Sequence, residues 1–269
     1  MVIITADDFG LHESVNEAVE RAYREGVLST TSLMVGAPAC ADAIERAKRL
    51  SGLRVGLHLV MADGVSVLPR SAIPDLVDAN GRFSRSMFLD GLRFFFLPWV
   101  RRQLWAEIRA QFERFRATGL VLDHVNTHKH FHLHPTVLAM ILKIGPEFGL
   151  KAMRLPHVSR APFWLKPWMA YVRSRLDACG IVHNDYVVGL FESGHLDEET
   201  LLRALENLPD GVGEIYLHPA VVSGGSIAPS MLTYRHAEEL AALLSPRVKA
   251  LIQSRTIRVG SFSDLSEAV

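Results

Sequence analysis

Leu120-Val-Leu-Asp-His-Val-Asn-Thr-His-Lys-His-Phe-His-Leu-His-Pro135 joins an apolar run to a helical pattern that continues to Phe148. The apolar run Leu120–Val125 is typical of a buried β-strand, and the pattern of Pro135–Phe148 is typical of an amphipathic helix. The same alternation of strand and helix recurs along the whole chain. It predicts a mainly parallel sheet whose strands are joined by right-handed crossovers.

Eight apolar runs are predicted to be strands and six amphipathic stretches to be helices. The predicted strands are Val2–Ala6, Thr31–Val35, Val55–Val60, Leu120–Val125, Ala152–Leu155, Tyr186–Leu190, Glu214–Leu217 and Thr256–Val259. The predicted helices are Val15–Arg24, Ala39–Leu50, Leu104–Arg116, Pro135–Phe148, Glu198–Leu208 and Tyr234–Leu244. Eight strands in 269 residues favour an α/β fold with a single distorted (β/α) barrel over an open sheet. Residues 1–269 are expected to form one domain, with an irregular aromatic and basic insertion around residues 61–102.

Composition and charge exclude several classes of function. The chain has 49% hydrophobic and 22% charged residues, and its 29 basic and 29 acidic side chains give a net charge of zero. A nucleic-acid partner is therefore not expected. The two cysteines are too few for a disulfide framework, and no stretch resembles a signal peptide or a membrane span. We therefore expect a cytoplasmic location.

The quoted stretch contains five histidines, at positions 124, 128, 130, 132 and 134. Imidazole is the commonest protein ligand for metal ions. In an extended chain, His128, His130 and His132 share one face, whereas in a helix His128 and His132 become neighbours. Such a run can also be solvated or structural, so it does not establish a metal site by itself.

Further polar residues follow or end other predicted strands. Asp7 and Asp8 come directly after the first strand, His58 ends another, and His218 and Arg154 end two more. Adjacent aspartates can also form a helix cap or a turn, and a single histidine in an apolar strand is more often a hydrogen-bonded core residue. All of these residues fall at the predicted carboxyl ends of strands. This shared position indicates an active site, because barrel enzymes build their active sites there.

This set of side chains fits metal-assisted hydrolysis. One carboxylate and two imidazoles leave coordination positions open, and a divalent metal lowers the pKa of bound water and polarises a carbonyl group. A second aspartate can accept the proton of the water, and a histidine can protonate a leaving amine. The chain has no Gly-x-Ser-x-Gly elbow and no Gly-rich phosphate loop.

Four motifs resemble those of the YdjC-like carbohydrate deacetylase family, which includes the chito-oligosaccharide deacetylases. They are Ala-Asp-Asp-Phe-Gly (6–10), Gly-Leu-His-Leu (56–59), Thr-His-Lys-His-Phe-His-Leu-His-Pro (127–135) and Leu-His-Pro (217–219). The resemblance implies a distorted (β/α) barrel, one divalent metal ion (magnesium or zinc) and removal of an N-acetyl group from an amino sugar.

The resemblance also implies roles for individual residues. Asp8, His58 and His128 correspond to metal ligands, although Asp7 and Asp8 could exchange roles. Asp7 corresponds to the general base, His218 to the general acid and Arg154 to the residue that orients Asp7. Asn126 stands where many relatives have aspartate, so the tuning of the site through this position is open. His130 and His132 remain candidates for substrate contact, for support of the ligands or for a structural role.

The amino-acid sequence of the histidine motif most resembles that of the hopanoid-biosynthesis branch (HpnK) of the family. This branch implies a substrate with an N-acetylglucosaminyl head and a hopanoid tail. Two aromatic and basic segments, residues 92–105 and 162–169, could then contact a membrane surface at the inner face of the cytoplasmic membrane. They could equally pack on the barrel or form a homodimer contact. Three alternatives remain: a hydrolase of another amide or ester, a non-catalytic sugar- or lipid-binding barrel, and metal storage by the histidine run.

Overall fold

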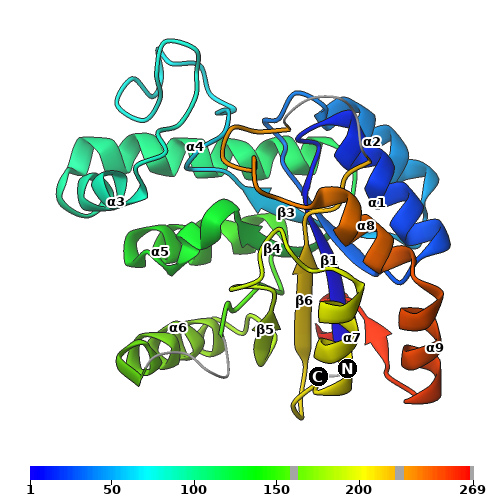
Figure 1. The fold of residues 1–269 in the computed structure, drawn as a ribbon. Helices are drawn as coiled ribbons and strands as arrows, with labels where there is room; N and C mark the ends of the chain where they lie inside the picture. Colours follow the sequence, from blue (N-terminus) through cyan, green and yellow to red (C-terminus); the bar gives the residue numbers. More distant parts are fainter. Residues whose placement is uncertain (158–162, 222–226, 267–269) are drawn as a thin grey trace.

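Parallel strands form one curled sheet, and helices surround it (Figure 1). The computed structural model describes residues 1–157, 163–221 and 227–266. The strands are β1 (Val2–Phe9), β2 (Thr30–Leu33), β3 (Arg54–Leu59), β4 (Leu122–Thr127), β5 (Tyr186–Val188), β6 (Gly213–Leu217) and β7 (Val259–Gly260). Their order is β4-β3-β2-β1-β6-β5, and β7 pairs with the start of β1. The predicted distorted (β/α) barrel is confirmed.

The distortion lies between the edge strands β4 and β5. The predicted strand Ala152–Leu155 is present only as isolated bridges, from Met153 to Val125 and from Ala152 to Val182. Farther along, the amide of Val187 in β5 donates to the carbonyl of His157. An irregular segment therefore fills the place of a strand, and this segment carries Arg154 into the barrel.

All six predicted helices are present, with shifted ends. They are α1 (Glu13–Glu25), α2 (Cys40–Arg49), α4 (Pro98–Ala117), α5 (Pro135–Ile144), α7 (Glu198–Glu206) and α8 (His236–Leu244). Helix α5 ends earlier than predicted, and Gly145–Phe148 continue it as the 3₁₀ turn η2. Helix α4 begins earlier, at Pro98, because proline is well suited to the first helical position.

Among the described residues, the structure has four further helices that the sequence patterns did not predict. They are α3 (Met87–Phe96), α6 (Lys166–Ala178), α9 (Pro246–Ser254) and the short α10 (Ser263–Ser266). Helix α3 escaped prediction because both of its faces are apolar: Phe94 is buried while Phe88 and Phe96 are exposed, so no helical period is visible. The stretch around residues 61–102 is thus irregular only as far as Ser86.

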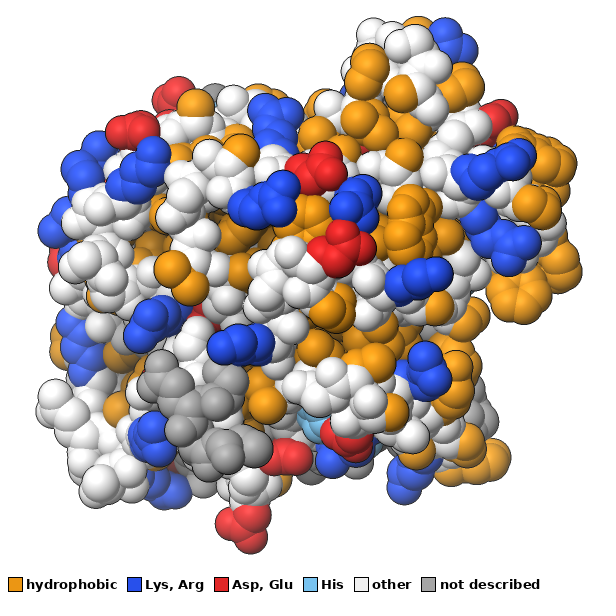
Figure 2. Space-filling model, turned by 180° about the vertical axis from the view of Figure 1, so that it is seen from behind, with side chains coloured by type: hydrophobic (Ala, Val, Ile, Leu, Met, Phe, Trp, Pro, Cys, Tyr) orange, Lys and Arg blue, Asp and Glu red, His pale blue; other side chains and the backbone are white. Residues whose placement is uncertain are grey.

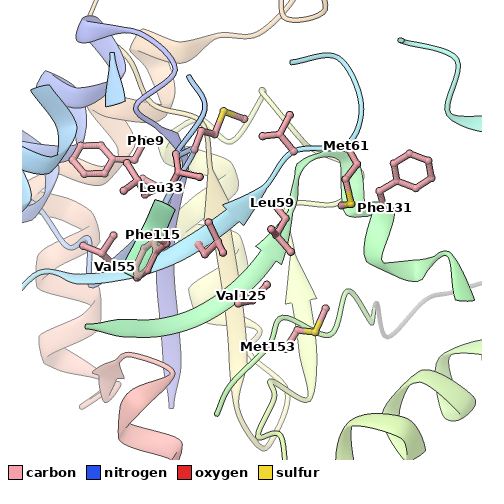
Figure 3. Close-up of a cluster of buried hydrophobic side chains, with 14 of the residues drawn as sticks. Phe9, Leu33, Val55, Leu59, Met61, Phe115, Val125, Phe131 and Met153 are labelled. Atoms are coloured by element: carbon pink, nitrogen blue, oxygen red, sulfur yellow. The ribbon is translucent and has the colours of Figure 1, made fainter. Parts of the chain in front are cut away.

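The two faces of β1 have different surroundings. Val2, Ile4 and Ala6 belong to the main hydrophobic core, together with residues of the neighbouring strands and of the covering helices (Figure 3). Ile3 instead packs on Phe262 inside the barrel, at the end where the strands begin. Because successive strand residues point to opposite faces, Thr5 and Asp7 also point inward. Along β1 the interior therefore changes from the apolar contact of Ile3 with Phe262 to the polar Thr5 and Asp7 toward the carboxyl ends of the strands.

Candidate active site

The polar residues predicted at the strand ends come together in the structure. Asp7, His58, His128 and His218 line one cavity of about 140 Å³ at the carboxyl ends of the strands. Asp8 lies behind the three histidines, with its carboxylate 3.1–4.0 Å from each ring. Asp7 and Asp8 lie in β1 and His58 lies in β3, whereas His128 and His218 directly follow β4 and β6.

The backbone of Asp8 explains how two adjacent carboxylates reach the same site. Asp8 has φ 64°, in the left-handed region, and the pairing of β1 with β2 shifts its register between Ala6 and Phe9. Such an irregularity re-aims a side chain that regular strand geometry would turn to the opposite face. Aspartate tolerates this conformation better than most residues. Asp7 and Asp8 therefore approach the site from different directions.

Asp8, His58 and His128 form a group that could hold a metal ion. Asp8 Oδ1 lies 3.2 Å from His58 Nε2 and 3.1 Å from His128 Nδ1, and the two nitrogens are 3.3 Å apart. Ligand atoms about 2.0–2.2 Å from one Zn²⁺ are separated from each other by roughly 3 to 3.5 Å. The spacing of the three atoms therefore fits a single divalent cation. Of the two aspartates, Asp8 is the one beside both rings.

The charges around Asp8 also suit a cation. Asp8 Oδ2 is buried and has no hydrogen-bond partner among the described residues. Burial alone would raise the pKa of Asp8, but His128 and His58 outweigh it and hold the pKa well below its usual value. Likewise, burial opposes protonation of His58, but Asp7 and Asp8 raise its pKa. The site thus favours an added positive charge, which a bound metal ion would supply.

Asn126 and Ser32 fix the orientation of His58. His58 Nδ1 lies 2.7 Å from Asn126 Oδ1 and 3.0 Å from Ser32 Oγ. Asn126 Nδ2 donates to Asp7 Oδ1 at 3.0 Å, and Ser32 Oγ donates to the same oxygen at 2.9 Å. Asn126 Oδ1 and Ser32 Oγ are therefore the acceptors for the N–H group at Nδ1 of His58. This tautomer leaves the lone pair of Nε2 facing Asp8.

Arg154 holds Asp7 from below the cavity. Its guanidinium donates to both oxygens of Asp7, at 2.6 and 2.9 Å, and to both oxygens of Glu214, at 2.7 and 2.8 Å. All three side chains are buried. Burial would raise the pKa of Asp7, but Arg154, aided by His58, lowers it far below the usual value. Asp7 therefore remains ionised at neutral pH.

His218 lines the same cavity as Asp7. Its Nε2 is 4.0 Å from Asp8 Oδ2, and its ring contacts those of Tyr216 and Tyr234. The backbone of His218 is fixed at both ends, because its amide donates to the buried Glu239 and its carbonyl bonds to His236. Burial lowers the pKa of His218, and the two aspartates oppose this only partly. An imidazolium here is thus a stronger acid than one in water.

The rest of the histidine run is dispersed. Lys129 and His130 both have φ 55°, so the chain turns sharply after β4 and follows neither a strand nor a regular helix. His130 lines the cavity and bonds to the hydroxyl of Tyr216 at 3.1 Å. His132 is buried and bonds to Thr127. His124 pairs with Asp123, its neighbour in the chain, at the opposite end of β4.

Several residues of the site were not singled out by the sequence patterns. They are Ser32, Glu214, Tyr216, Tyr234 and Lys129, whose ammonium group is 2.7 Å from Asp63. A charged residue in an apolar strand was the available signal for Glu214. Tyrosines and serines in strands gave no comparable signal, because these residue types are common there.

Comparisons with known proteins show which proteins the chain is similar to. A carbohydrate deacetylase of Brevibacillus brevis is 32% identical over 98% of this chain and 99% of its own length. A carbohydrate deacetylase of Vibrio cholerae is 29% identical over 99% and 97%. The crystal structure of an Enterococcus faecalis protein, named as a candidate for cellobiose-phosphate cleavage, superposes with a TM-score of 0.80 at 25% identity over 98% of both chains. The family model for YdjC-like proteins matches residues 1–254, so the chain belongs to the YdjC-like family.

Proposed function

We propose that this protein is a metal-dependent deacetylase that removes an N-acetyl group from an amino sugar. The observation that carries the proposal is the buried Asp8–His58–His128 group, with Asp7 and His218 on the wall of the adjoining cavity. The carbohydrate deacetylases to which the chain is similar support a sugar substrate. Asp8, His58 and His128 would hold one divalent cation, which when bound polarises the amide carbonyl and makes water more acidic.

The protein's own side chains would carry the proton transfers. Asp7, kept ionised by Arg154, accepts a proton from the attacking water as its oxygen bonds to the carbonyl carbon. The carbon–nitrogen bond then breaks, and His218 donates a proton to the leaving nitrogen. Asp7 has a low proton affinity, so it then releases its proton through solvent, and His218 is protonated again for the next cycle. The products are acetate and a free amino sugar.

His130, His132 and Asn126 would support the reaction without taking part in proton transfer. Asn126 orients His58, and His132 closes the turn that positions His128. His130 adds to the wall of the cavity. Burial keeps the pKa values of both His130 and His132 below their usual range, so both rings are neutral at neutral pH. A neutral ring can bind a sugar hydroxyl as donor or acceptor.

The surroundings of the site favour a substrate with an apolar substituent. A second cavity of about 330 Å³ shares His128 and Met231 with the catalytic cavity. Its wall is mainly aliphatic and includes Leu11, Met34, Val60, Val65, Ile227 and Pro229. An aliphatic pocket suits a hydrocarbon better than a second sugar ring. We therefore propose a lipid-linked amino sugar, such as an N-acetylglucosaminyl hopanoid, as the substrate; chito-oligosaccharides are the second candidate because of the relatives' carbohydrate specificity.

Acetate release tests the proposed function. The protein is stripped of metal by chelation, reloaded with Mg²⁺ or Zn²⁺, and assayed on an N-acetylglucosaminyl hopanoid and on chito-oligosaccharides. We expect release that depends on the added metal and that Asp7→Asn lowers by about 10²–10⁴-fold. Asp177→Asn, an exposed carboxylate change on α6, is the matched control and should have no effect.

Each alternative gives a different result in this assay. Release from neither substrate would contradict the deacetylase assignment, and release by Asp7→Asn equal to wild type would remove Asp7 from its role. A sugar- or lipid-binding barrel would retain its ligand after chelation and release no acetate. Metal storage by the histidine run predicts several ions per chain, whereas the proposed site holds one.

A further inference from the structure

We propose that helix α3 and the start of α4 dock the protein on an anionic membrane surface. The docking surface, called the α3 ridge below, consists of Phe88, Leu89, Leu92, Phe95, Phe96 and Trp99. The inference goes beyond the deacetylase chemistry and does not depend on it, because it rests on the exposure and charge of residues that do not line the catalytic cavity.

Helix α3 uses only one face for packing. Phe94 is buried against Phe131, with ring centroids 5.3 Å apart, and Gly91 lies against the ring of His134. These contacts attach α3 to the turn after β4 and to the start of α5. In Figure 1, α3 lies at the margin of the molecule, beyond the end of α4 and away from the sheet. Of the α3 ridge, Phe95 contacts the ring of His134, with centroids 6.4 Å apart, and remains 50% exposed.

The exposed face of α3 is continuous and strongly apolar. Phe88, Leu92 and Phe95 follow one another at helical spacings of four and three residues, Phe96 lies four residues after Leu92, and Leu89 adjoins them. Phe88 is 76% exposed, Phe96 is 64% exposed and Trp99 is 49% exposed. Figure 2 shows hydrophobic side chains gathered at the edge of the molecule that α3 occupies. A contiguous apolar patch of this kind marks an interaction site, because isolated soluble domains rarely expose one.

The charges beside the α3 ridge select an anionic partner. Residues 84–105 contain four arginines and one aspartate, although the whole chain is neutral. The aspartate, Asp90, is buried and paired with Arg93. Arg101 and Arg102 follow Trp99 by two and three residues, and neither has an ion pair among the described residues. Two copies of this surface facing each other would bring arginines together, whereas anionic headgroups would neutralise them.

Exposed phenylalanine and tryptophan beside arginine are the side chains that settle at a membrane–water interface. No helix in the part of the chain that the structure describes is long and apolar enough to cross a bilayer, so the contact would be peripheral. Arg85, two residues before α3, lines the aliphatic cavity beside the catalytic site. Docking through the α3 ridge would therefore place the mouth of that cavity close to the bilayer.

Vesicle flotation tests the proposal. We expect the full chain to float with vesicles of phosphatidylcholine containing roughly one third phosphatidylglycerol, to float less as salt rises, and to bind pure phosphatidylcholine weakly. The variant Phe88→Ser/Phe95→Ser/Phe96→Ser should lower the partition coefficient at least about tenfold. Arg101→Glu/Arg102→Glu should lower it on anionic vesicles only. Phe191→Ser, a change at another exposed aromatic, is the matched control and should bind like wild type.

Two outcomes would overturn the proposal. One is a wild-type protein that binds neither type of vesicle. The other is a dimer, detected by sedimentation, that the triple variant dissociates without any change in flotation; the α3 ridge would then be a contact between copies of the chain. Thermal unfolding checks that the variants fold, and acetate release from chito-oligosaccharides reports on the catalytic site separately. Loss of flotation with unchanged release would leave the proposed function intact.

Discussion

Two neighbouring aspartates differ at the residue scale because their partners differ. Asp7 Oδ1 accepts from Arg154, Ser32 and Asn126, but its Oδ2 accepts from Arg154 alone and can still take a proton; Asp8 meets imidazole rings and keeps one oxygen without a partner among the described residues. The guanidinium of Arg154 already balances the charge of Asp7, whereas the bare oxygen of Asp8 retains capacity for a metal ion. Chemically identical side chains thus suit a proton acceptor and a metal ligand.

Asn126 should control metal affinity through His58. In Asn126→Ala, the ring of His58 loses its shortest hydrogen bond, so its orientation and its tautomer are less well fixed. We expect metal affinity to fall by about 10–100-fold, which is typical for loss of a partner behind a metal ligand. Competition of the metal-free protein with a chromophoric chelator measures this change. Asn207→Ala, at the exposed end of α7, serves as the control. Unchanged affinity in Asn126→Ala would mean that Ser32 alone orients the ring.

At the scale of elements, the turn between β4 and α5 positions His128. The strand ends at Thr127, and two consecutive residues with positive φ reverse the chain before α5 begins. Thr127 Oγ1 accepts from the amide of His132 and also bonds to its ring. A single buried hydroxyl therefore closes the turn.

Replacement of Thr127 by valine should loosen this turn. The shape of the side chain is kept, but the amide and the ring of His132 are left buried without their partner. We expect the free energy of unfolding to fall by about 1–3 kcal/mol. Urea denaturation measures the change. Thr31→Val is the control. It removes one hydrogen bond, from the hydroxyl of Thr31 to the carbonyl of Ala6 in the same barrel, and the free energy of unfolding should fall by less. Equal losses would show that the turn has no special dependence on Thr127.

At the scale of the whole molecule, the two ends of the barrel differ in character. The carboxyl ends of the strands carry the candidate site. At the other end, Asp123 bonds to His124 and accepts from both the amide and the hydroxyl of Ser263, which ties the C-terminal segment to β4. Hydrogen bonds at this end stabilise the barrel, and the opposite end can therefore tolerate strained backbone such as that of Asp8.

The Asp123 network should contribute stability that disappears in acid. Burial would raise the pKa of Asp123, but hydrogen bonds from His124 and Ser263 outweigh it and lower the pKa from 3.8 to about 2. Because the folded pKa is the lower one, the contribution is complete above about pH 4 and is lost as the pH falls toward 2. A shift of this size corresponds to about 2 kcal/mol.

Urea denaturation of Asp123→Asn and wild type at pH 6, 4 and 3 tests this dependence. The stability difference between the two proteins should be largest at pH 6 and should shrink toward pH 3. Asp210→Asn, which alters an exposed carboxylate, should show a small difference at every pH. A difference that stays constant from pH 6 to pH 3 would contradict the assigned pKa.

Much of the barrel was predictable from sequence because burial leaves a local pattern. Apolar runs marked β1, β3 and β4, and amphipathic periods marked α1 and α2. The apolar pattern did not predict the correct element where the local sequence does not show which side chains are buried. Helix α3 is apolar on both faces, and Ala152–Leu155 is an apolar run that pairs through isolated bridges only. Whether a segment pairs as a strand depends on strands that are distant in the sequence, and a local sequence pattern cannot show this.

The sequence by itself determined which residues reach the carboxyl end of the barrel, because strand direction and length fix where Asp7, His58 and His218 emerge. Only the tertiary structure decided their pairing. The positive φ of Asp8 turns its carboxylate toward His58 and His128, and the irregular segment beside β4 inserts Arg154 under Asp7. Both depend on contacts between chain segments more than 100 residues apart, and their ångström-scale distances have no signature in residue order.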